Sequence, residues 1–145
     1  MLKIDAKTDY GLLIMLELGH HPGGIVPLGP LAKHLGVSSP YLSQIAKSLQ
    51  RAGLIASREG AGGGYYLARP AENIGVMEML EALSGQLKVR CHHEYCAHFG
   101  NCGLRSAWPL ILSDIKASLQ GRSLASLLSS GREAPTKFAL KTGKV

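Results

Sequence analysis

The sequence of residues 27–55 is PLGPLAKHLGVSSPYLSQIAKSLQRAGLI, and this stretch decides the fold. Its first part places apolar residues on one helical face and stops at Gly36, which predicts a short helix. Ser38 or Ser39 then caps a longer helix, in which Pro40 occupies the tolerated first turn. Apolar residues of the longer helix follow the i, i+3, i+4, i+7 rule, at Leu42, Ile45, Ala46 and Leu49. Two helices joined by a glycine-containing turn predict a helix-turn-helix.

A predicted wing follows these two helices. Residues 54–59 and 65–69 predict two strands, joined by the glycine-dense tip 60–64. Apolar periodicity predicts further helices over 8–19, capped by Thr8 or Asp9, from Val76 to Gly85, and from Leu104 onward. The predicted fold class is therefore mainly α with a small β-hairpin wing, a winged helix-turn-helix with a long C-terminal helix.

The polar face of the longer helix is suited to a DNA major groove. Gln44 is the best candidate for reading bases, because its amide can pair with adenine through two hydrogen bonds. Lys47, Arg51 and Arg58 are expected to contact phosphate, and the glycine tip allows close approach of backbone to a minor groove. The alternative is that the two helices are only a packing unit and that the polar face of the longer helix is simply solvated. The predicted DNA-contacting residues are Ser39, Tyr41, Ser43, Gln44, Lys47, Arg51, Arg58, Gly62 and Gly63.

Composition agrees with a nucleic-acid partner. The chain has 145 residues, one domain in length, with 46% hydrophobic residues, which excludes wholesale disorder. Sixteen Lys and Arg against ten Asp and Glu leave a net charge of +6, which favours a polyanionic partner, either nucleic acid or an anionic membrane surface. No apolar run reaches the roughly 18–20 residues of a membrane span, so a cytoplasmic location is expected. No complete catalytic constellation is present, and we expect no enzyme activity.

All three cysteines lie in one short segment, at Cys91, Cys96 and Cys102, with C-x4-C-x5-C spacing. Thiolates so spaced can surround one metal centre and leave a coordination position to another group. An iron–sulfur cluster and a zinc ion both remain open, as do free thiols and a thiol redox switch. Three nearby histidines would suit zinc: His92, His93 and His98.

Four motifs together resemble the IscR/NsrR/RirA-type (Rrf-two) winged-helix iron–sulfur regulators. These are TDYGL (8–12), YLSQIAKSLQRAGLI (41–55), SREGAGGGYYLARP (57–70) and the cysteine spacing. The resemblance covers residues 1–129 and implies a cytoplasmic bacterial transcription factor, a repressor that binds double-stranded DNA as a homodimer. It implies dimerisation through the helix that begins near Leu104–Trp108.

The resemblance also implies a cofactor. In the family the cysteines hold a 2Fe–2S or 4Fe–4S cluster whose loss, oxidation or nitrosylation changes DNA affinity, so the resemblance favours such a cluster over zinc. IscR-like members have a histidine three residues after the last cysteine, where this chain has Arg105, which cannot ligate. In NsrR-like members an aspartate of the first helix reaches the partner's cluster, and Asp9 matches that position, although it also suits a helix cap. His98 and His93 are further candidate ligands.

The organisation predicted along the chain has three parts and a tail. Residues 1–86 form the DNA-binding part, residues 87–103 the cysteine loop, and residues 104–129 the dimerisation region. Residues 130–145 are expected to be a basic, disordered tail. Pro109 lacks an N–H, so the regular helix is expected to start near Trp108 or to kink there.

Overall fold

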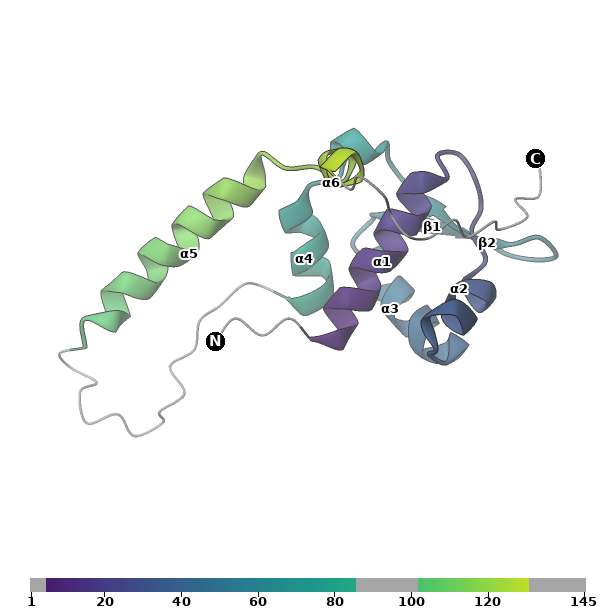
Figure 1. The fold of residues 1–145 in the computed structure, drawn as a ribbon, viewed down its shortest axis with the longest axis horizontal. Coiled ribbons are helices and arrows are strands. Elements are labelled where there is room, and N and C mark those ends of the chain that lie inside the picture. The colour runs from purple at the N-terminus through teal and green to yellow at the C-terminus, as the bar shows by residue number, and fades with distance from the viewer. Residues whose placement is uncertain (1–4, 86–101, 131–145) are drawn as a thin grey trace.

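The computed structural model describes residues 5–85 and 102–130. Its elements combine into a mainly helical fold with one antiparallel hairpin, which confirms the predicted class. Figure 1 shows α5 extending away from a body made by the other elements. In chain order the elements are α1 (Ala6–His20), α2 (Leu28–Leu35), α3 (Ser39–Arg51), β1 (Ile55–Arg58), β2 (Gly64–Leu67), the 3-10 helix η1 (Ala71–Asn73), α4 (Val76–Ser84), α5 (Leu104–Gln120) and α6 (Leu124–Ser130).

The helix-turn-helix forms where the sequence predicts it. Gly36 ends α2 in the left-handed region at φ 68°, which glycine adopts without strain. Ser38, rather than Ser39, caps α3, because its hydroxyl accepts a hydrogen bond from the Tyr41 N–H at 3.3 Å. The four apolar side chains of α3 are fully buried in the core: Leu42, Ile45, Ala46 and Leu49.

The hairpin is held against the body by a third backbone segment. Its strands pair in register from Ile55 with Leu67 to Arg58 with Gly64. Beside them, the Val26 N–H donates to the Tyr65 carbonyl at 2.8 Å, and the Tyr65 N–H donates to the Val26 carbonyl at 2.9 Å. A side chain at Gly64 would place its Cβ 2.5 Å from the Val26 oxygen, so only glycine fits there.

The first helix differs from its prediction at its N-terminus. It begins at Ala6, and Asp5 is the cap: its Oδ1 accepts from the Thr8 N–H at 2.8 Å and from the Thr8 hydroxyl at 2.6 Å. The prediction that Thr8 or Asp9 caps the helix is therefore wrong. Both lie inside the first turn, where the free N–H groups need an acceptor from a residue before them. Gly11 lies against Leu83, so α1 and α4 approach closely.

The long helix α5 also differs from its prediction. It begins at Leu104, four residues before Trp108, and runs through Pro109 as one continuous coil (Figure 1). A start near Trp108 is therefore wrong: the missing proline N–H removes one hydrogen bond, and the helix continues past it. After α5, the shorter α6 returns to the body, where Leu124 is buried. None of the helices in the described ranges is long and apolar enough to cross a membrane.

Candidate nucleic-acid interface and cysteine segment

The predicted reading face of α3 is exposed. Tyr41, Gln44, Lys47 and Arg51 are open to solvent, on the side of the helix opposite its buried apolar residues, and Ser43 is half-buried. Ser39 is exposed in the first helical turn. The helix therefore has the division that a recognition helix needs, with one side packed in the core and one side free to enter a groove.

The wing extends the same surface with backbone rather than bulky side chains. Arg58 is exposed at the end of β1. At the tip, Gly60 and Gly62 have φ values of 96° and 75°, in the region that favours glycine. The Gly63 N–H donates to the Gly60 carbonyl at 3.0 Å, and a side chain at Gly63 would collide with the Arg58 carbonyl. A tip so built can approach a narrow groove closely.

Two side-chain contacts that the sequence did not suggest orient this surface. Gln50 of α3 donates through Nε2 to the Ser57 hydroxyl of β1 at 3.0 Å and links the recognition helix to the wing. Tyr10 of α1 packs edge to face on Tyr41, with ring centroids 6.0 Å apart and planes at 87°. Each contact joins two different elements, so no spacing within one helix or strand indicates it.

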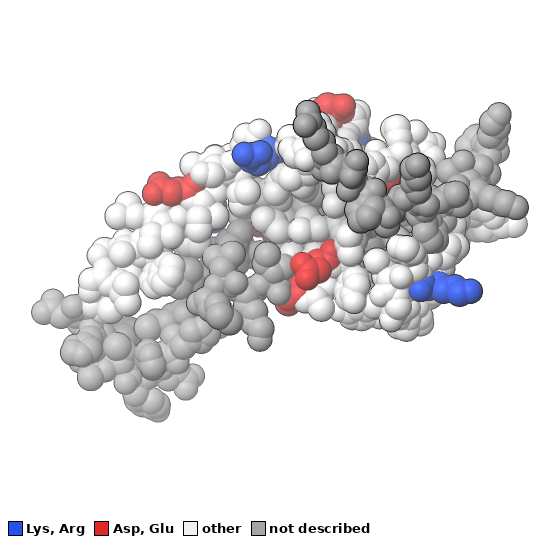
Figure 2. All heavy atoms as spheres, in the orientation of Figure 1, with Lys and Arg blue, Asp and Glu red and all other residues white. Residues whose placement is uncertain are grey.

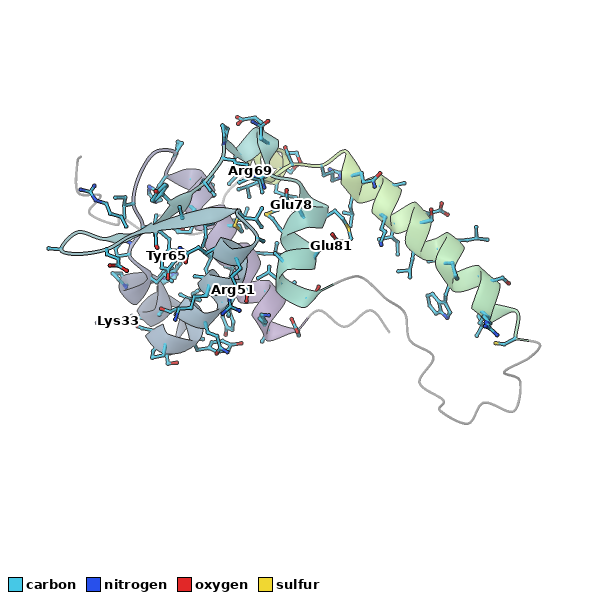
Figure 3. The ribbon with its side chains drawn as sticks, turned by 180° about the vertical axis from the view of Figure 1, so that it is seen from behind. Lys33, Arg51, Tyr65, Arg69, Glu78 and Glu81 are labelled. Atoms are coloured by element: carbon cyan, nitrogen blue, oxygen red, sulfur yellow. The ribbon has the colours of Figure 1, made fainter. Side chains whose placement is uncertain are left out.

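Charge is distributed unequally over the chain. Residues 21–69 carry five basic residues and one acidic residue, which leaves a net +4, whereas residues 70–85 carry three acidic residues and no basic one. Figure 3 shows Lys33 of α2 and Arg51 of α3 on the side of the hairpin. Figure 2 shows the opposite side, with Asp and Glu side chains near the adjoining ends of α1 and α4, along α5 and near η1, and with Lys or Arg side chains beside α2 and near the C-terminal end of α5. The positive charge thus accompanies the proposed DNA-reading elements.

Lys33 is an interface candidate that the sequence interpretation missed. It is exposed on α2, the first helix of the helix-turn-helix. In this motif the first helix crosses the DNA backbone, so an exposed lysine there is placed for a phosphate contact. Its position in the predicted short helix, on the side away from the apolar residues, was the signal that could have indicated it.

The predicted cluster ligands are only partly within the described residues. Cys91 and Cys96 lie outside them, as do His92, His93 and His98. Cys102 is a free, half-exposed thiol directly before α5, and Asp9 is exposed in the first turn of α1. The first turn of α1, which carries Asp9, and the beginning of α5, which follows Cys102, lie apart in both ribbon views (Figures 1 and 3). Within ranges 5–85 and 102–130, no group of three or more metal-binding side chains occurs.

The fold defines a winged-helix DNA-binding protein, with an exposed face of α3 beside a β-hairpin wing. The chain belongs to the Rrf2 family, whose profile, described as an iron-dependent transcriptional regulator, matches residues 4–130. The resemblance inferred from the sequence motifs is thereby confirmed.

Proteins of known name and solved structure match this chain over most of its length. The HTH-type transcriptional regulator IscR of Aliivibrio salmonicida is 33% identical over 130 residues, 88% of this chain and 77% of that protein. Among solved structures, T. potens IscR has a TM-score of 0.72 at 34% identity and covers 93% of this chain and 92% of its own. CymR, the global cysteine regulator of B. subtilis, has a TM-score of 0.74 at 33% identity, with coverages of 90% and 98%. This chain is accordingly a DNA-binding transcriptional regulator and not an enzyme.

Proposed function

We propose that the protein is a cytoplasmic homodimeric repressor whose affinity for an operator is controlled by an iron–sulfur cluster. In this proposal residues 1–86 contact DNA, residues 87–103 hold the cluster and residues 104–129 join the two subunits. The signal is iron–sulfur status, nitric oxide or redox state.

The observation that carries the proposal is the two-sided character of α3 beside the wing. Its apolar side is buried, while Gln44 and Lys47 on the other side are exposed, and Arg58 of the wing continues the charged surface. In this arrangement Gln44 contacts a base edge, whereas Lys47 and Arg58 contact phosphates and add affinity without sequence information.

Dimerisation is supported by the exposed apolar side chains of α5. This helix buries none of its residues in the described part of one chain, although it contains a periodic apolar stripe. Exposed apolar surface of this kind marks a surface that another protein covers. The stripe follows i, i+4, i+7, i+11 spacing, at Leu104, Trp108, Ile111 and Ile115.

The placement of Cys102 and Asp9 fits a cluster shared between subunits. The Cys102 thiol is accessible, and Asp9 is not used as a helix cap, so its carboxylate is available to a ligand. Because the first turn of α1 and the beginning of α5 lie apart within one chain, Asp9 would complete the ligand set of Cys91, Cys96 and Cys102 from the partner subunit. Such a cluster supplies a redox-active, nitric oxide-reactive centre beside α5.

The test is anaerobic reconstitution followed by a visible absorption spectrum, iron and sulfide counts, and operator binding. A coloured protein with iron and sulfide, and with DNA affinity that changes when the cluster is removed, is the expected result. A colourless protein with stoichiometric zinc would instead indicate a zinc-stabilised regulator. If the Cys102→Ser variant lost its response to oxidant without a change of metal content, the protein would be a thiol switch. Either result would contradict the proposal that an iron–sulfur cluster controls DNA affinity.

A further inference from the structure

In the part of the chain that the structure describes, the segment between α5 and α6 connects α5 to the body of the molecule. The segment between α5 and α6 pairs with the turn before α4: the Val76 N–H donates to the Arg122 carbonyl at 2.9 Å, and the Leu124 N–H donates to the Ile74 carbonyl at 2.8 Å. Because α5 buries no side chain in the described residues, this backbone pairing and the contacts with α4 determine the direction of the helix.

Arg69 spans the same turn from the wing side. It follows β2, and its Nη2 donates to Glu78 Oε1 of α4 at 2.6 Å, while its Nη1 donates to the Asn73 carbonyl of η1 at 3.3 Å. Figure 3 labels both side chains beside α4. The guanidinium therefore bridges the two ends of the turn 73–78, which contains Gly75, a residue with no side chain to restrict the backbone.

This ion pair contributes little to global stability, because its side chains are 40% and 43% exposed and solvent screens such pairs. The pair matters more for orientation than for stability. An arginine that donates to a carboxylate and a carbonyl at once fixes the relative orientation of these two acceptors. The expected consequence of its loss is thus a change in the orientation of elements rather than unfolding.

We propose that Arg69 and Glu78 are positioning residues whose ion pair sets the angle between α5 and the DNA-reading unit of α2, α3 and the wing. This inference rests on the proposed dimeric function. In a two-fold dimer joined through α5, that angle determines the separation of the two recognition helices. The separation in turn determines which half-site spacing the dimer accepts.

The test measures spacing selectivity rather than affinity alone. An operator is first selected by the wild-type protein from a random DNA pool, and versions with one base pair inserted or deleted at its centre are then compared. Wild-type protein is expected to lose at least about tenfold in affinity on the altered spacings. Glu78→Ala is expected to lose only about threefold, because its subunits can adopt more than one angle.

Glu72→Ala is the matched control. It removes the same charge from the same segment, so its general effect on DNA attraction is equal, but exposed Glu72 lies outside the ion pair. It should retain wild-type selectivity. If the wild type is selective and Glu78→Ala is equally selective, the positioning role is overturned. If the wild type shows no spacing selectivity, the dimeric function fails, and the inference fails with it.

Discussion

Ile111→Ala is the most direct test of the α5 dimer interface. The Ile111 side chain is 44% exposed in one chain and lies in the apolar stripe of α5. The substitution removes three carbon groups, each contributing about 0.8 kcal/mol when fully buried, so the exposed fraction corresponds to about 1 kcal/mol per subunit. Two-fold symmetry makes the loss occur twice, about 2 kcal/mol in total, which corresponds to roughly a thirtyfold weaker dimer.

The assay is sedimentation equilibrium of the DNA-free protein over a range of concentrations, with the cluster state held constant. Leu110→Ala is the matched control, because Leu110 is the neighbouring residue, is 68% exposed and lies about 100° around α5 from Ile111, outside the stripe. Its dimer dissociation constant should change much less. Equal effects of the two substitutions would contradict the assignment of the stripe, and an unchanged constant in both would refute dimerisation through α5.

Five other substitutions test the remaining assignments. Gln44→Ala should relax the preference for one base pair, by about 1–3 kcal/mol for a bidentate contact. Lys47→Ala should instead weaken binding to all DNA sequences alike and reduce the salt dependence of binding. Fluorescence anisotropy with single-base operator variants distinguishes the two. Asp5→Ala should lower the melting temperature at neutral pH. Hydrogen bonds from Thr8 lower the pKa of Asp5, so this difference should disappear as the pH falls through that lowered pKa. Asp9→Asn should leave the melting temperature nearly unchanged but reduce iron content after reconstitution. Gly64→Ala should destabilise the protein by about 1–3 kcal/mol in denaturant titration, since the added carbon has no space.

The DNA-reading half could be predicted from the sequence because its signals are local. The spacing of Leu42, Ile45 and Leu49 identifies the buried side of α3, and Gly36 with Ser38 marks the turn between the helices. Helical periodicity and capping depend on residues within a few positions of each other, so one chain segment contains the whole signal.

The helix ends were less predictable. Asp5, Thr8 and Asp9 are all of residue types that can cap a helix. Only the hydrogen bonds of the folded chain select Asp5. Pro109 similarly suggests a later start of α5. Proline removes one backbone hydrogen bond, however, and does not end a helix whose neighbouring turns keep theirs.

The sequence by itself determined the class of this protein, a winged helix-turn-helix regulator with three clustered cysteines before a long helix. Only the tertiary structure decided which distant groups meet: Gln50 with Ser57, Tyr10 with Tyr41, and Arg69 with Glu78. It also decided that the first turn of α1 and the start of α5 lie apart in one chain (Figure 1), which assigns Asp9 of that turn to a partner subunit's cluster in the proposed function. The physical reason is that these relations depend on how helices and strands pack, and packing depends on the combined shape of many side chains rather than on any local pattern.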